Sequence, residues 1–284
     1  MIKLIVSDMD GTLLRHDSTI SKENLEAIKE AQRKGVQFAI ATGRDYSSLK
    51  GLLEDHGLEC FSILGNGAQF CNKEGTILSS AYFPKQRFKA VLKVLDDLNI
   101  NYMIFAADGF YTTVDSNIVR DAFIERCIVR FGNQREDYFN DGPKHNMACM
   151  KLQKINDLDE FIDSSVEIIK VEAFDNDVSL IEQAKEKLQT IDDIAYLSSF
   201  DDNVEVTAFK AQKGLILEQI VKDAGLDKDE VMVIGDGLND ITLFEHFKYS
   251  FAPSNANELI KSMAYQVVAS CQENGVKQAI EMMV

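Results

Sequence analysis

The sequence has no long apolar run and no paired cysteines. No run approaches the ~20 apolar residues that a helix needs to cross a bilayer. Before Ser7 the N-terminus offers only Leu4-Ile5-Val6, which is too short for the apolar core of a signal peptide. The five cysteines are scattered, include no CxxC pair and are odd in number, so no disulfide framework is expected. These absences predict a soluble, cytoplasmic protein with reduced thiols and no membrane partner.

Basic residues are also scarce. Lys and Arg number 30 against 46 Asp and Glu, which gives a formal net charge of -16. A nucleic-acid-binding protein normally carries a basic surface, so this class of partner is disfavoured. An acidic enzyme that acts on an anionic phosphate must supply a local cation, and Mg²⁺ is the simplest candidate.

What the sequence does contain is the alternation of an α/β protein. The 284 residues, 45% of them hydrophobic, are enough for two domains of modest size. Residues 2–7, 36–41 and 61–64 are typical of buried parallel strands, and amphipathic helices are expected between them. Ser21 is expected to cap the first helix, and Gly35 to end it. This order predicts a doubly wound parallel sheet.

The pattern changes after about residue 80. Asp108-Gly109, between the apolar runs Tyr102–Ala107 and Phe110–Val114, predicts a β-hairpin. Helix-like stretches lie near 85–98, 117–127, 156–163 and 178–189, and strand-like runs lie at 147–152, 166–174, 194–199 and 203–207. The parallel pattern then returns near residue 212. We therefore expect a catalytic core made of residues 1–82 and 209–284, with an α+β cap domain inserted at 83–208.

Four polar segments follow expected core strands or begin expected helices, which is where open α/β sheets bind ligands. They are Asp8-Met9-Asp10-Gly11-Thr12, Thr42-Gly43, Lys213-Gly214 and Gly235-Asp236-Gly237-Leu238-Asn239-Asp240. Gly11 lets the chain turn sharply and brings backbone N–H groups toward an anion. Thr42 offers a hydroxyl donor beside Gly43, where a helix N-terminus can also face an anion.

The carboxylates in these segments point to a cation. Asp8 and Asp10 leave a buried strand on the same side, and two such close carboxylates repel unless one binds a metal or a proton. Asp236 and Asp240 add carboxylates from another strand end, and Lys213 adds an ammonium group. Such a set suits a hard cation that bridges to phosphate oxygens.

In order and spacing, these segments resemble the four motifs of the haloacid dehalogenase superfamily, over roughly residues 1–80 and 210–284. Gly65-Asn66-Gly67-Ala68 and the long insert between the second and third motifs resemble its Cof-type subgroup. The resemblance implies a phosphoric monoester hydrolase with Mg²⁺ as cofactor. Such an enzyme hydrolyses a small phosphorylated metabolite through an aspartyl-phosphate intermediate.

The resemblance also implies roles for the carboxylates. Asp8 is the expected nucleophile. Asp10 is the expected general acid for the leaving alcohol and then the general base for water. The expected metal ligands are the side chains of Asp8 and Asp236 and the backbone carbonyl of Asp10.

The remaining motif residues are expected to bind phosphate or to support the site. Thr42, the backbone at Gly43, and Lys213 would hold the phosphoryl oxygens and offset their charge. Asn239 would contact the phosphoryl group or its water. Asp240 would steady Lys213 or a metal-bound water.

Each of these residues also has an ordinary interpretation. Asp8 and Asp10 could be turn residues, since Asp-Gly pairs are common in turns. Lys213 could be a solvated lysine at a helix start, and Lys210 lies close by in the sequence as a rival. Arg44 could reach the substrate or form a surface salt bridge. The four histidines show no metal-ligand spacing and receive no role.

The function itself has alternatives. Sugar phosphates, or phosphorylated cofactors such as flavin or pyridoxal phosphates, are the substrates that the resemblance suggests, with the inserted domain closing on them. The first alternative is a phosphomutase that uses the same aspartyl-phosphate chemistry but returns the phosphoryl group to a sugar. The second is a non-catalytic metabolite-binding protein, which the full motif set disfavours because a binder does not need Asp8, Asp10 and Lys213 together.

Overall fold

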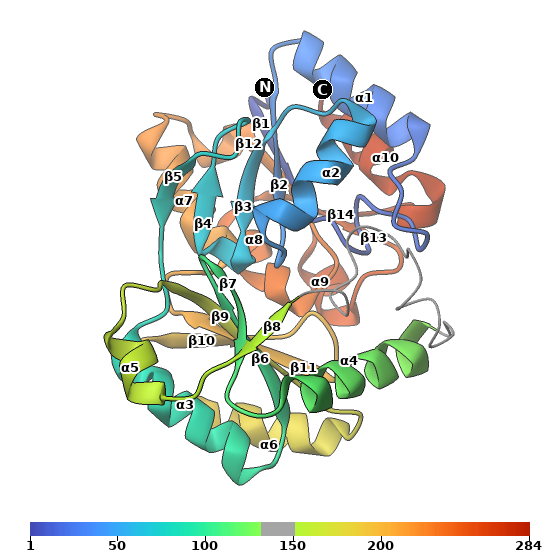
Figure 1. Cartoon of the computed structure of the whole chain (residues 1–284). Helices are drawn as coiled ribbons and strands as arrows, with labels where there is room; N and C mark the ends of the chain where they lie inside the picture. Colours follow the sequence, from blue (N-terminus) through green and yellow to red (C-terminus); the bar gives the residue numbers. More distant parts are fainter. Residues whose placement is uncertain (132–150) are drawn as a thin grey trace. The chain divides into compact units, whose positions relative to one another are not determined.

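A computed structural model describes residues 1–131 and 151–284. The chain forms two compact units, one made of Met1–Ala81 with Lys210–Val284 and the other of Tyr82–Phe209. Among the described helices, none is long and apolar enough to cross a membrane. Each unit has its own sheet (Figure 1).

The first unit contains an eight-stranded sheet in the order β14-β13-β12-β1-β2-β3-β4-β5. Its strands are β1 (Leu4–Ser7), β2 (Gln37–Ala41), β3 (Phe61–Leu64), β4 (Gln69–Cys71), β5 (Ile77–Ser80), β12 (Val231–Ile234), β13 (Tyr249–Pro253) and β14 (Gln266–Val268). Neighbours from β14 to β3 pair in parallel, and β4 and β5 extend the sheet antiparallel. In register, Leu4 of β1 lies between Val231 of β12 and Gln37 of β2.

Helices cover both faces of this sheet (Figure 1). They are α1 (Lys22–Arg33), α2 (Tyr46–His56), α7 (Lys213–Asp223), α8 (Ile241–His246), α9 (Glu258–Met263) and α10 (Gly275–Met283). Ile5 of β1 packs in one cluster with α1, α2 and α10, whereas Leu4 and Val6 pack in another with α7, α8 and α9. Because side chains alternate along a strand, an all-apolar strand fills both layers. The predicted doubly wound parallel sheet is confirmed.

Two local predictions for the first unit, the residues that begin and end α1, are confirmed. The Ser21 side chain accepts a hydrogen bond from the Asn24 N–H at 3.1 Å and so caps α1. Gly35 lies just beyond the end of α1 with a left-handed φ of 89°.

The second unit contains a six-stranded sheet in the order β10-β11-β9-β6-β7-β8. Its elements are α3 (Lys85–Asp97), β6 (Asn101–Ala106), β7 (Gly109–Thr112), α4 (Ser116–Phe131), β8 (Leu152–Lys154), α5 (Leu158–Asp163), β9 (Ile168–Phe174), α6 (Val178–Leu188), β10 (Ile194–Leu197) and β11 (Asn203–Ala208). All its pairs are antiparallel except β7 with β8. Helices α3 and α6 pack on one face through a separate apolar cluster. This is the α+β architecture expected of the inserted segment.

Two details of the second unit differ from expectation. The β6–β7 hairpin forms, but Ala106 pairs with Gly109, so the two turn residues are Ala107 and Asp108 rather than Asp108 and Gly109. Gly109 is therefore the first residue of β7. The expected strand-like run 147–152 begins outside the described residues, and β8 starts at Leu152.

Candidate active site

The candidate site lies at the carboxyl ends of the central parallel strands. Asp8 follows β1, Thr42 follows β2, and Gly235-Asp236 follows β12. The Asp8 N–H donates to the Ile234 carbonyl at 2.8 Å, so the chains leaving β1 and β12 stay paired. Parallel pairing therefore brings together segments that are more than 200 positions apart in the sequence.

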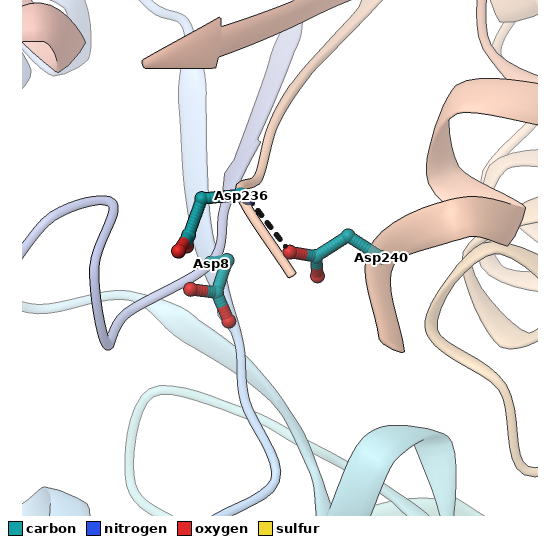
Figure 2. A group of neighbouring side chains, drawn as sticks. All are labelled: Asp8, Asp236 and Asp240. Atoms are coloured by element: carbon teal, nitrogen blue, oxygen red, sulfur yellow. Dashed lines mark hydrogen bonds between the residues drawn. The ribbon is translucent and has the colours of Figure 1, made fainter. Parts of the chain in front are cut away.

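Three carboxylates gather at this edge (Figure 2). Asp8, Asp236 and Asp240 each offer an oxygen, and these oxygens lie within 4.8 Å of one another. The backbone N–H groups of Asp236 and Gly237 donate to one Asp240 oxygen at 2.9 and 3.0 Å. Asp240 is thus fixed by the turn that follows β12, and Figure 2 shows the bond from Asp236.

Lys213, the first residue of α7, joins two of these carboxylates. Its Nζ donates to Asp8 Oδ1 at 2.6 Å and to Asp240 Oδ1 at 2.7 Å. The Lys213 side chain is 0% exposed, so the interpretation as a solvated helix-start lysine is wrong. Lys210, the rival lysine in the sequence, is exposed.

Burial disfavours the ionised forms of Asp8 and Asp236. It raises the pKa of Asp8 well above its ordinary value, with Lys213 opposing the rise and the charges of Asp240 and Asp236 adding to it. Burial, followed by the charge of Asp240, raises the pKa of Asp236 to about 7. Burial alone would lower the pKa of Lys213, but the attraction of Asp240 and Asp8 raises it overall, so this lysine stays charged.

The donor set fits a hard divalent cation. With all groups ionised, three carboxylates and one ammonium leave a net charge of -2 in a buried space. Both oxygens of Asp240 are already engaged by the N–H groups and Lys213, so Asp8 and Asp236 are the pair best placed to bind an ion. Carboxylate oxygens are the ligands that Mg²⁺ prefers.

The glycine of the first motif is required by the Asp236 carboxylate. A Cβ added at Gly11 would lie 2.4 Å from Asp236 Oδ2, and the φ of Gly11 is +90°. Next to it, Thr12 Oγ1 donates to Asp236 Oδ1 at 2.5 Å and holds this carboxylate in place. No role was predicted for Thr12 from the sequence, although this residue is part of the first motif.

Asp10 takes a different position from Asp8. Asp8 is buried, whereas the Asp10 side chain is 45% exposed and meets Arg44 in a two-bond ion pair. Within the described residues, the carboxylate cluster does not include the Asp10 side chain. Arg44 was expected either to reach the substrate or to form a surface salt bridge, and the structure shows a salt bridge. Its partner, Asp10, is a candidate catalytic residue.

The phosphate-binding candidates lie on neighbouring loops. Thr42 is buried, and its hydroxyl accepts from the Arg44 N–H at 3.2 Å, which leaves its hydrogen able to donate. Asn239 is also buried, and its Nδ2 donates to Asn66 Oδ1 at 3.2 Å. Asn66 was predicted only as part of the resemblance to the Cof-type subgroup. It is the second residue after β3, and this position was the available signal for a place at this edge.

A family model described as haloacid dehalogenase-like hydrolase matches residues 5–280. The chain belongs to this family. Phosphatase YwpJ of Bacillus subtilis is 28% identical over 279 residues, which are 97% of each chain. The 5-amino-6-(5-phospho-D-ribitylamino)uracil phosphatase YwtE of the same organism is 29% identical over 99% of this chain and 97% of that relative. A solved haloacid dehalogenase-like hydrolase from B. subtilis aligns with a TM-score of 0.85 at 26% identity over 100% of both chains.

These similarities confirm the predicted family and enzyme class. As a haloacid dehalogenase-like hydrolase with phosphatase relatives along its whole length, the chain is a phosphoric monoester hydrolase. The alternative of a non-catalytic binding protein is set aside. All the site residues predicted from the sequence lie in the first unit, the one made of Met1–Ala81 and Lys210–Val284.

Proposed function

We propose that this hydrolase is a Mg²⁺-dependent phosphatase that moves the phosphoryl group of a small metabolite first to Asp8 and then to water. The observation that carries the proposal is the hydrogen bond from Lys213 to Asp8, inside a buried acidic cluster at the strand ends. A nucleophilic carboxylate needs to be ionised and held still. The ammonium group of Lys213 serves both needs.

In the first step, an Asp8 oxygen attacks phosphorus while the bond from phosphorus to the leaving oxygen breaks. Asp10 gives a proton to that oxygen, so the product leaves as an alcohol. Thr42, Asn239 and Lys213 hold the phosphoryl oxygens. In the second step, Asp10 removes a proton from water, and the water oxygen attacks phosphorus. The bond to Asp8 breaks, and inorganic phosphate leaves.

Mg²⁺ would be held by the side chains of Asp8 and Asp236 and by the backbone carbonyl of Asp10. When bound, it offsets the negative charge of the cluster and of the phosphate. The raised pKa of Asp236 supports this assignment, because burial and then the charge of Asp240 disfavour its ionised form unless a cation is bound. Asp240 acts on Lys213 rather than on the ion in this proposal.

For the substrate, we propose a sugar phosphate or a phosphorylated cofactor or its precursor. The support comes from the relative named a 5-amino-6-(5-phospho-D-ribitylamino)uracil phosphatase. The substrate in that name carries a phosphorylated ribityl chain. The second unit, Tyr82–Phe209, supplies none of the predicted site residues, and we propose that it acts as the cap that selects the leaving group.

Release of inorganic phosphate from a panel of phosphorylated metabolites, with and without Mg²⁺, tests the proposal. The phosphatase assignment requires release without a bisphosphate activator, whereas a phosphomutase would need the activator and would return the phosphoryl group to sugar. Asp8→Asn should abolish release from every substrate. Activity that survives Asp8→Asn would contradict the assignment of the nucleophile.

A further inference from the structure

The Gly65-Asn66-Gly67 turn is a sequence motif that the proposed reaction does not use. It follows β3 directly, and all three residues are buried. Asn66 is 0% exposed and has a left-handed φ of 59°, which is uncommon for a residue with a side chain. A buried and strained turn beside a candidate site suggests that the surrounding structure requires it.

The backbone of this turn holds the loop after β2. The Asn66 N–H donates to the Thr42 carbonyl at 3.0 Å, and the Gly65 N–H donates to the Arg44 carbonyl at 3.0 Å. These two bonds flank Gly43 on both sides. The turn therefore fixes the loop that carries Thr42.

The Asn66 side chain holds a residue of the last motif. Asn239 Nδ2 donates to Asn66 Oδ1 at 3.2 Å, and both side chains are buried. The bond joins residues that are 173 positions apart in the sequence. It sets the direction of the Asn239 amide.

Gly67 brings the turn against the start of α7. A Cβ added at Gly67 would lie 2.9 Å from both the N and C atoms of Gln212, and the φ of Gly67 is +113°. Gln212 is the N-cap of α7, and Lys213 is its first residue. The close approach of two backbones, which only glycine permits, therefore sets where the Lys213 side chain begins.

We infer that the Gly65-Asn66-Gly67 turn is a positioning element that aligns Thr42, Asn239 and Lys213 around the phosphoryl group. The inference rests on the proposed function, because that proposal gives these three residues their roles. Asn66 and Gly67 act through their neighbours and do not contact the phosphoryl group. The turn joins three of the four motifs, since it contacts the second, third and fourth.

The first test is Gly67→Ala, compared with two matched glycine variants. Gly35 and Gly225 also have left-handed φ values of +89° and +66°, but a Cβ at either would meet nothing within 4 Å. Gly35→Ala and Gly225→Ala thus carry the same kind of backbone strain without the clash. A displacement of about 1 Å in a catalytic group can cost about 10²-fold in rate. We expect kcat of Gly67→Ala to fall by about that factor, with kcat of both controls near wild type.

The second test isolates the side chain of Asn66. Asn66→Gly keeps a backbone that tolerates positive φ and removes the side chain whose Oδ1 accepts from Asn239. We expect weaker binding of inorganic phosphate, measured by equilibrium dialysis, and a lower kcat/KM. If Asn66 acts through Asn239, Asn66→Gly should add little to the loss caused by Asn239→Ala. If Gly67→Ala fails to fold, the comparison of Asn66→Gly, Asn239→Ala and the double variant tests the inference alone.

Two results would overturn the inference. One is a Gly67→Ala protein as active as the Gly35 and Gly225 controls. The other is full additivity of the losses from Asn66→Gly and Asn239→Ala. Failure of the proposed function looks different, because the wild-type chain would then release no phosphate or would not need Asp8. Binding of inorganic phosphate by the variants would still decide whether the turn positions the anion site.

Discussion

Arg44 donates two hydrogen bonds to the carboxylate of Asp10, from Nε to Oδ2 at 2.9 Å and from Nη2 to Oδ1 at 2.5 Å. This paired geometry is the strongest that arginine makes with a carboxylate. It holds the Asp10 carboxylate in one position, where the proposed reaction needs a proton donor in its first step and a proton acceptor in its second.

Arg44→Met should therefore slow hydrolysis of the phosphoenzyme more than its formation. Without Arg44, the partly exposed Asp10 loses the two hydrogen bonds that fix its position, and hydrolysis of the phosphoenzyme depends on Asp10 as the base. We expect phosphoenzyme to accumulate in the steady state, with kcat lower by about tenfold, a part of the 10²–10⁴-fold typical of general acid–base catalysis. Rapid quenching with radiolabelled substrate measures the bound fraction.

Arg87→Met is the matched control. Arg87 also makes a two-bond contact with an aspartate, Asp193, at 2.9 and 3.3 Å, but it lies in the second unit. The Arg87→Met substitution should leave the amount of phosphoenzyme at the wild-type value. An Arg44→Met protein that behaves like Arg87→Met would show that the Arg44–Asp10 pair is only a surface contact.

Asp10→Asn should be sensitive to the leaving group. It keeps the nucleophile and the backbone carbonyl at position 10 but loses proton transfer, worth about 10²–10⁴-fold in rate. A nitrophenolate leaves without a proton, so phosphorylation of Asp8 should survive better with nitrophenyl phosphate than with a sugar phosphate. Single-turnover rates on both substrates check this. Equal losses on the two would mean that Asp10 is not the acid.

Stability without Mg²⁺ should fall as pH rises. An unfolded aspartate has a pKa of about 3.9, whereas burial raises the pKa of Asp236 to about 7 and that of Asp8 also upward. Between these values the folded chain binds more protons than the unfolded chain, so the free energy of unfolding decreases with rising pH. Mg²⁺ replaces those protons and should raise Tm more at about pH 8 than at about pH 5.

Thermal melts with and without Mg²⁺ at the two pH values measure this difference. Asp236→Asn should remove most of the Mg²⁺ effect and make the metal-free protein more stable at the higher pH, because it removes a buried charge. An equal Mg²⁺ effect at both pH values would place the ion away from Asp8 and Asp236.

The metal should also be selective. Chelation should abolish phosphate release, and Mg²⁺ should restore it. Ca²⁺ should restore it poorly, because its looser and higher coordination misplaces the nucleophile. Initial rates in the presence of each ion, after removal of divalent cations, check this. Full activity in excess chelator would contradict the metal assignment.

Much of the site could be predicted because its residues follow short apolar strands. Asp8 and Thr42 come directly after such strands, Asp236 is the second residue after another, and parallel strands end at one edge. The nearly continuous apolar run of β1 also predicted a buried parallel strand. Local pattern and the geometry of parallel sheets are enough for this much.

The contacts between side chains could not be predicted in the same way. Lys210 and Lys213 are three positions apart and chemically alike, and only the packing of α7 buries one of them. The Asn66–Asn239 bond depends on how two loops meet, and no periodicity encodes that meeting. The β6–β7 turn fell one residue earlier than predicted, since cross-strand register determined it rather than the Asp-Gly pair.

The central claim is that Asp8 receives the phosphoryl group, and trapping the phosphoenzyme tests it most directly. Asp10→Asn, incubated with Mg²⁺ and radiolabelled substrate, should accumulate label because its phosphoenzyme lacks the base for hydrolysis. After acid quenching and proteolysis, the account predicts the label on the peptide that contains Asp8, and none in the Asp8→Asn/Asp10→Asn double variant. Label on another residue, or turnover by Asp8→Asn without any labelled protein, would contradict the account.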